Sequence, residues 1–219
     1  MEILSSLEAR WFIDDLEGAS AKAAREWFER VEVQGKRADR YLLTGRDDIG
    51  FKARVEEGRP AKIEIKYLLD SLGATPVHDG FVGTLERWQK LSLTVTDDAL
   101  EKQGEWVRIA KARRLRKFAY DHGVVRPAAA DALPEAGCGV ELTELDYEVF
   151  GTKKRALTLG VEAFGPKHLL LEVFQRVGEV AFEDARGLRL GEDRSESYPA
   201  WLTRVGSTRT LSSLQGASE

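Results

Sequence analysis

The sequence of 219 residues is poor in the side chains that build disulfide frameworks and thiolate or histidine metal sites. It contains one cysteine, Cys138, and three histidines. A single cysteine excludes an internal disulfide and any metal site with several thiolate ligands. The histidines His78, His122 and His168 lie in unrelated segments. The sequence therefore gives no reason to expect a histidine acid–base pair or a histidine metal site.

The sequence also lacks long hydrophobic runs. Its longest apolar stretches are only a few residues, whereas a helix that crosses a bilayer needs about 20. The N-terminal segment "MEILSSLEARWFIDD" has no basic region followed by an apolar core, which a secretory signal peptide would have. We therefore expect a cytoplasmic protein without a membrane segment.

An excess of positive charge and the common nucleotide-binding glycine loops are missing as well. With 33 Lys and Arg against 37 Asp and Glu, the net charge is −4 at pH 7. That balance argues against a surface devoted to nucleic acid, although residues 112–117, "ARRLRK", form one basic cluster. Neither a P-loop nor a Rossmann fingerprint is present, so ordinary nucleotide-binding folds are not supported.

Alternation of apolar and charged residues is the dominant pattern that is present. In "IGFKARVE" (49–56) and "AKIEIKYLL" (61–69), charged residues recur at every second position. Successive side chains of a strand point to opposite faces, so each segment has one apolar and one charged face. The same pattern predicts eight strands, at residues 6–13, 39–44, 49–56, 61–69, 83–95, 105–120, 139–150 and 155–164.

Two segments have helical periodicity instead. Residues 19–31 place Trp27 and Phe28 on an apolar stripe, and residues 166–181 begin with Pro166, a residue favoured at the first position of a helix. Residues 123–138 are rich in Pro, Ala and Gly and predict a loop or a short helix between two strands.

Together these elements predict an α+β fold. Eight antiparallel strands are enough to close a barrel whose interior holds side chains or one small ligand. We therefore predict an eight-stranded antiparallel β-barrel, or tunnel, with flanking helices. It forms a single domain over residues 1–205, followed by a polar and disordered tail at residues 206–219.

The charged residues that recur at every second position of these strands are the candidate residues of a phosphate- or metal-binding site. If they faced a common lumen, Lys and Arg would bind phosphate oxygens, and carboxylates would hold Mg²⁺ or Mn²⁺. Alternation is also the ordinary pattern of a sheet with one solvated face, so it leaves both interpretations open. The basic candidates are Lys52, Arg54, Lys66, Arg87, Lys111 and Arg113, and the acidic candidates are Glu8, Glu64, Glu141 and Glu162.

The order of these segments resembles the CYTH superfamily, the triphosphate tunnel metalloenzymes. The resemblance covers most of residues 5–181 and implies a tunnel that binds a small phosphorylated anion, such as a triphosphate, polyphosphate or nucleotide. It also implies triphosphate hydrolysis with Mg²⁺ or Mn²⁺. The motifs that carry it are "FKAR" with Lys52 and Arg54, "EIK" with Glu64 and Lys66, "AKAR" with Lys111 and Arg113, and "GVELTEL" and "LGVEAF" with Glu141 and Glu162.

The first strand departs from the family's Glu-x-Glu-x-Lys signature. In "EARWF", Glu8 matches the first glutamate, but Arg10 stands where the second should be and Phe12 where the lysine should be. Arg10 removes a metal ligand and adds a positive charge that opposes cation binding.

The departure leaves three alternatives. Glu141, Glu144 and Glu162, with water, still hold the metal and the tunnel hydrolyses a triphosphate. Alternatively, the tunnel binds phosphate without metal, with Arg10 as a further phosphate ligand. In the third alternative the charged strand faces only meet solvent, and the chain is a structural or interaction protein.

Overall fold

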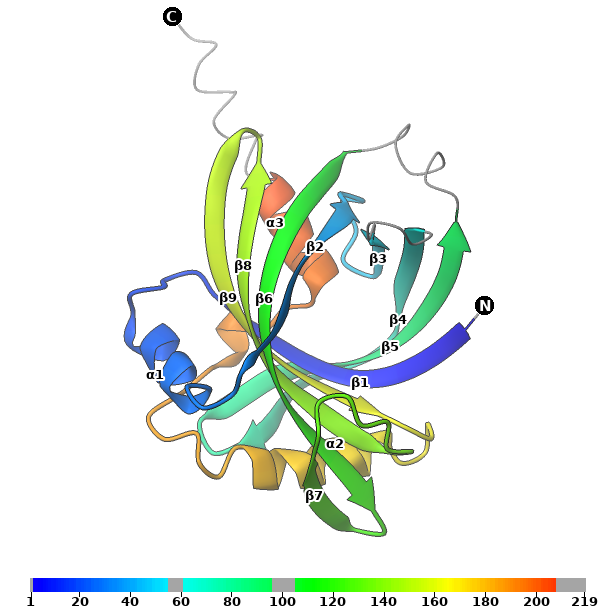
Figure 1. Cartoon of the computed structure of the whole chain (residues 1–219), viewed down its shortest axis with the longest axis vertical. Coiled ribbons are helices and arrows are strands. Elements are labelled where there is room, and N and C mark those ends of the chain that lie inside the picture. The colour runs from blue at the N-terminus through cyan, green and yellow to red at the C-terminus, as the bar shows by residue number, and fades with distance from the viewer. Residues whose placement is uncertain (1, 55–60, 96–104, 208–219) are drawn as a thin grey trace, which may run out of the picture.

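The structure is a computed structural model that describes residues 2–54, 61–95 and 105–207. Three α-helices accompany nine strands in this part of the chain: α1 (Ala19–Trp27), α2 (Leu170–Ala181) and α3 (Tyr198–Ser207) (Figure 1). The strands are β1 (Glu2–Ile13), β2 (Val33–Leu42), β3 (Ile49–Arg54), β4 (Ala61–His78), β5 (Phe81–Val95), β6 (Trp106–Asp121), β7 (Val124–Ala128), β8 (Gly137–Val149) and β9 (Thr152–Phe164).

Eight of the strands close into a barrel. Their order is β2-β3-β4-β5-β1-β9-β8-β6, and pairing of β2 with β6 closes the circle. Every pairing between named strands is antiparallel. The predicted α+β class and the eight-stranded antiparallel barrel with flanking helices are therefore confirmed.

The ninth strand, β7, was not predicted from the sequence. It lies inside residues 123–138, where a loop or short helix was predicted, and pairs with β6 outside the closed circle. The two residues of the turn between β6 and β7, His122 and Gly123, both have positive φ (45° and 84°). Two such residues form the tight turn that a β-hairpin favours, so Val124 and Val125 pair back onto β6.

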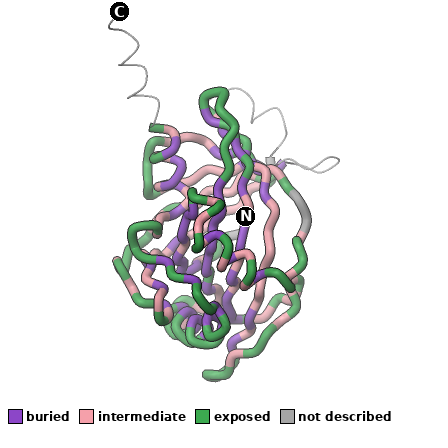
Figure 2. Tube along the Cα trace, turned by 90° about the vertical axis from the view of Figure 1, so that its left-hand side faces the viewer, coloured by how far each residue is buried: buried purple, intermediate pink, exposed green. Residues whose placement is uncertain are grey.

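The main hydrophobic core lies outside the barrel wall. The outward apolar side chains of β1, β8 and β9 pack against α1 and α2 in one cluster that includes Trp11, Phe28, Leu142, Leu159 and Phe174. Because helices cover this outer face, the alternate residues of the same strands point into the barrel. Buried and half-buried residues accordingly run along the strands, and exposed residues gather at turns (Figure 2).

The helix boundaries differ from the prediction. α1 ends at Trp27, before residue 31, since the N–H of Phe28 caps the last carbonyls of the helix. α2 begins at Leu170 and not at Pro166, because residues 166–169 form a turn in which the N–H of Leu169 donates to the Pro166 carbonyl. No helix in the described ranges is long and apolar enough to cross a membrane.

The third helix, α3, was missed in the sequence and enters one end of the barrel. Trp201 is fully buried and stacks on Phe12, with ring centroids 4.7 Å apart. These two residues belong to a second core cluster, which includes Ile109, Leu145 and Leu202. α3 runs to Ser207 and so crosses the predicted domain end at residue 205. The rest of the predicted tail, residues 208–219, lies outside the described residues.

Candidate functional site

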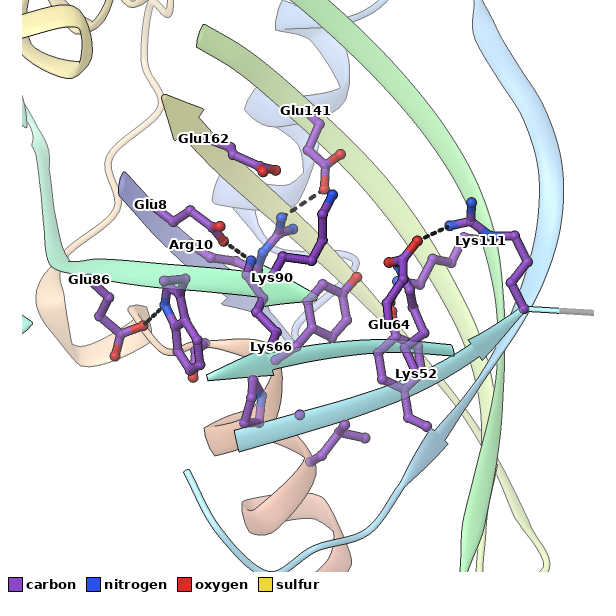
Figure 3. Close-up of a pocket in the computed structure, with 18 of the residues that line it drawn as sticks. Glu8, Arg10, Lys52, Glu64, Lys66, Glu86, Lys90, Lys111, Glu141 and Glu162 are labelled. Atoms are coloured by element: carbon purple, nitrogen blue, oxygen red, sulfur yellow. Dashed lines mark hydrogen bonds and ion pairs between the residues drawn. The ribbon is translucent and has the colours of Figure 1, made fainter. Parts of the chain in front are cut away.

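The inward-facing residues enclose a charged cavity of about 330 Å³, which we call the inner chamber (Figure 3). Tyr198, Pro199 and Leu202, from the start of α3, close one side of it. Charged side chains from strands β1–β6, β8 and β9 form the rest of its wall. The eight basic ones are Arg10, Arg37, Lys52, Arg54, Lys66, Lys90, Lys111 and Arg113, and the five acidic ones are Glu8, Glu64, Glu86, Glu141 and Glu162.

Ten of the eleven residues singled out from the sequence line this chamber. They come from strands far apart in the chain, and closure of the barrel brings them together. They are Glu8, Arg10, Lys52, Arg54, Glu64, Lys66, Lys111, Arg113, Glu141 and Glu162.

Arg87 is the residue that does not line the chamber, and its predicted place in the lumen is wrong. The β1–β5 register sets Glu86 opposite Glu8, so Glu86, Trp88 and Lys90 point inward and Arg87 points outward. Arg87 lies on the outer face, 3.5 Å from Asp70. Period two separates the two faces of a strand, but only tertiary pairing decides which face is inside.

Glu144, a candidate metal ligand in one of the alternatives, also points outward. Its carboxylate lies 3.6 Å from Arg114 and 3.8 Å from Arg155 on the outer face. Three charged residues of the chamber, Arg37, Glu86 and Lys90, were missed in the sequence. Lys90 lies three residues after Arg87 on the same strand and so on the opposite face, and the choice of Arg87 as the inward residue therefore excluded Lys90.

Arg10 and Glu141 form the central ion pair of the chamber. Arg10 Nη2 donates to Glu141 Oε1 at 2.8 Å, and Arg113 Nη1 lies 3.7 Å from the second carboxylate oxygen. Gly160 lies between Arg10 and Glu141 in the strand register. A Cβ at Gly160 would come within 2.5 Å of the Arg10 guanidinium, so glycine leaves the room that this side chain occupies. Burial raises the pKa of Glu141, but Arg10 and Arg113 outweigh it and hold that pKa at about 2.

Two more carboxylates are neutralised by lysines. Glu64 pairs with Lys52, and Glu8 pairs with Lys66. Burial opposes ionisation of Glu64, yet the Lys52 ammonium brings its pKa down to about 2. In the same way Lys66 outweighs burial and keeps the pKa of Glu8 below its usual value. Both carboxylates are therefore charged at neutral pH.

Lys111 is the most enclosed cation of the chamber. It is 7% exposed. Its ammonium donates to the Tyr41 hydroxyl at 2.6 Å and lies 4.1 Å from the centroid of the Tyr198 ring. Asp39, fully buried, lies 3.8 Å away and accepts a hydrogen bond from Arg54 Nε at 3.1 Å. Burial, followed by the nearby Lys52 ammonium, pushes the pKa of Lys111 well below its usual value.

Glu162 and Lys90 differ from their neighbours because neither makes an ion pair or a side-chain hydrogen bond within the described part of the chain. Glu162 lies opposite Glu8 in the β1–β9 register and is exposed to the solvent of the lumen. The Glu8 carboxylate, and then the enclosing protein, raise the pKa of Glu162. Lys90 belongs to the wall of the same chamber and is half-buried. The Lys90 charge attracts the Glu162 carboxylate but does not outweigh the repulsion from Glu8.

The carboxylates do not form a site for the expected Mg²⁺ or Mn²⁺. Among residues 2–54, 61–95 and 105–207, no group of three or more His, Cys, Asp or Glu side chains is placed to hold a metal ion. Glu8, Glu64 and Glu141 each pair with a cationic side chain. A divalent cation prefers several oxygen ligands and is opposed by nearby positive charge, so this arrangement does not fit one.

The chain is thus a closed eight-stranded barrel with a charged lumen, covered by helices. No protein-family model and no curated protein matches it. Among solved structures it is similar to a "putative adenylate cyclase" from Bacillus halodurans, with 9% identity and a TM-score of 0.40. That match covers 87% of this chain and 94% of the other. A similarity this distant says nothing about function, so the proposals below depend on the chamber itself.

Proposed function

We propose that the inner chamber binds a small phosphorylated anion, namely a triphosphate, a polyphosphate or the phosphate chain of a nucleotide. The observation that carries the proposal is that eight basic side chains line a cavity of about 330 Å³, against five acidic ones and the buried Asp39 beside Arg37, Arg54 and Lys111. Such an excess inside a barrel is unfavourable unless water or an anion compensates it. A phosphate chain supplies several charged oxygens in a volume of this order.

The ion pairs of the chamber show which cations are available to an anion. Lys90 makes no ion pair or side-chain hydrogen bond within the described residues, and Arg113 meets Glu141 only at 3.7 Å. Guanidinium groups bind phosphate oxygens in a bidentate manner, and ammonium groups act as point charges. We infer that Lys90 and Arg113 make the first contacts with the ligand, while Lys52, Lys66 and Arg10 stay closer to their carboxylates.

Binding without metal is the form of this function that the chamber favours. Because Arg10 occupies the Glu141 carboxylate, and lysines occupy Glu8 and Glu64, we derive no hydrolytic step through a divalent cation. Hydrolysis of a triphosphate with Mg²⁺ or Mn²⁺ stays a prediction, and the binding experiment below tests it as well.

The experiment uses tripolyphosphate as the probe and compares two basic residues of one strand. We expect Lys90→Ala to weaken tripolyphosphate binding about tenfold, since one charged contact is lost. Its matched control is Arg87→Ala, on the outer face of β5, which we expect to bind as the parent chain does. Calorimetric titration measures the affinities, and phosphate release with and without Mg²⁺ or Mn²⁺ measures hydrolysis.

Each outcome of this experiment decides between the alternatives. Binding without phosphate release supports a binding module, and metal-dependent release supports a triphosphatase. Absence of any binding, or equal effects of Lys90→Ala and Arg87→Ala, contradicts the proposal. The charged strand faces would then only meet solvent, as in the third alternative.

A further inference from the structure

A second cavity, of about 740 Å³, adjoins the inner chamber, and we call it the outer chamber. The two cavities share four wall residues: Lys90, Arg113, Glu141 and Glu162. Along β1, Phe12 contacts α3, whereas Leu4 lines the outer chamber. The outer chamber therefore lies towards the end of the barrel opposite α3, and the two chambers meet at the four shared residues.

The inward-facing positions change in character between the two chambers. On β9, the inward face passes from Glu162 to Phe164, and on β6 it passes from Arg113 to Leu115. On β1, Leu4 occupies the corresponding end, and Ser6 pairs with Phe164 across the β1–β9 register. β1, β9 and β6 thus place large apolar side chains at the same end of the barrel, whereas β8, which lies between β9 and β6, places Gly139 there.

These apolar side chains are incompletely covered by the protein. Leu4 is 45% exposed, and Leu115 and Phe164 are only half-buried. Lys117 also lines this chamber, but its ammonium donates to the Ala132 carbonyl at 2.7 Å and is engaged there. A concave surface with exposed apolar side chains next to a basic chamber is suited to a ligand with one anionic end and one apolar end.

We infer that the ligand is a phosphate or diphosphate ester of an apolar alcohol. Its phosphate groups occupy the inner chamber, and its hydrocarbon part lies in the outer chamber against Leu4, Leu115 and Phe164. This inference rests on the proposed function. An inorganic polyphosphate would leave these apolar side chains in water, although Ser5, Glu135 and Lys167 also line the chamber.

The experiment compares two probes with the same diphosphate group, geranyl diphosphate and inorganic pyrophosphate, by calorimetric titration. For the parent chain we expect geranyl diphosphate to bind at least about tenfold more tightly, because its hydrocarbon leaves water. Leu115→Ser should remove most of this preference and leave pyrophosphate binding unchanged. Leu4→Ser, at an exposed position near the N-terminus, tests the same wall if Leu115→Ser does not fold.

The experiment also includes a control variant outside the chambers and a test of lipid vesicles as an alternative source of phosphate esters. Leu171→Ser replaces a leucine that is 42% exposed on α2, away from both chambers, and should keep the preference. Vesicles of phosphatidylcholine with phosphatidic acid present the same chemistry in a bilayer, and we expect no binding to them.

The failure of this inference differs from the failure of the proposed function. If both probes bind the parent chain equally, the apolar wall plays no part and the inference is wrong, while anion binding stands. If neither probe nor tripolyphosphate binds, the proposed function fails too. If the chain binds the vesicles but not geranyl diphosphate, the inference that the ligand is a soluble ester is wrong.

Discussion

At the scale of single residues, a row of three carboxylates is the least balanced feature of the inner chamber. The register of the barrel sets Glu8 opposite Glu86 on one side and opposite Glu162 on the other. Lys66 neutralises Glu8, and Glu86 accepts a hydrogen bond from Trp88 Nε1 at 3.0 Å. Burial raises the pKa of Glu86, whereas the raised pKa of Glu162 comes first from the Glu8 charge. Repulsion from Glu8 therefore disfavours ionised Glu162.

Replacing Glu162 by glutamine removes this repulsion. The folded-state pKa of Glu162 is above its ordinary value of 4.5, so its ionisation costs stability as the pH rises through the folded pKa. We expect Glu162→Gln to raise the free energy of unfolding at about pH 7 by a few tenths to about 1 kcal/mol. The gain should shrink as the pH falls towards about 4.5, where the native carboxyl is protonated.

Urea unfolding of both chains at several pH values measures this difference. Glu183→Gln, at an exposed position after α2, is the control and should change stability little at any pH. A Glu162→Gln chain that is less stable at neutral pH would show that Glu162 has a stabilising partner instead.

At the scale of elements, α3 packs against the end of β1 that carries Phe12. The ring of Phe12 stacks on Trp201 and meets Tyr198 edge to face at 5.4 Å. An apolar side chain here gives α3 a surface to pack on inside the barrel end. α3 in turn brings Tyr198 over Arg10, 4.8 Å from its guanidinium, and so forms part of the inner chamber.

Removing the Trp201 side chain should therefore affect both the fold and the chamber. Trp201 is fully buried among Phe12, Tyr147 and Tyr198. We expect Trp201→Ala to lower the free energy of unfolding by about 3–5 kcal/mol, as for other large-to-small changes in cores. Thermal and urea unfolding measure the loss.

The control for this change is Arg204→Ala on the exposed side of the same helix. Arg204 pairs with Glu196 at 2.6 Å at the surface, where such pairs contribute about 0–1 kcal/mol. Similar losses for Trp201→Ala and Arg204→Ala would contradict the assignment of α3 to the core.

At the scale of the whole molecule, the sign of the charge differs between the lumen and the chain. The chain carries a net charge of −4, whereas basic side chains outnumber acidic ones in the inner chamber. Most of the negative charge therefore lies outside the lumen. The inner chamber attracts a soluble anion, and the rest of the protein repels it. Long-range electrostatic steering of the anion is therefore weak, and binding depends on contacts inside the inner chamber.

Tripolyphosphate should accordingly raise the melting temperature in a salt-dependent manner. A ligand at about 100 times its dissociation constant stabilises the folded state by about 2.7 kcal/mol. We expect this gain to fall by about half or more between about 0.02 M and about 0.3 M sodium chloride, since salt screens partly exposed charges. Differential scanning calorimetry at both salt concentrations measures the shift. A gain that does not depend on salt would contradict charge-based binding.

Local pattern was enough to predict most of the barrel. Period-two alternation located the eight strands of the closed circle, although β2 begins at Val33 and β4 runs to His78, beyond the predicted segments. It failed at β7, whose segment reads as Pro- and Ala-rich, and at α3, a ten-residue helix. α3 depends on contacts with residues far away in the sequence, such as Phe12. β7 pairs locally with β6 through a two-residue turn, but its composition is not that of a strand.

The sequence by itself determined which residue types alternate, and thus the strands and the residues that share a face; ten of the eleven candidates chosen in this way line the chamber. Only the tertiary structure decided which face of each strand points inward, because that depends on where the helices cover the sheet. This choice put Arg87 outside and Lys90 inside, and paired Arg10 with Glu141 across the gap at Gly160. The ion pairs, and hence the charges left for a ligand, arise from strands that meet only when the barrel closes.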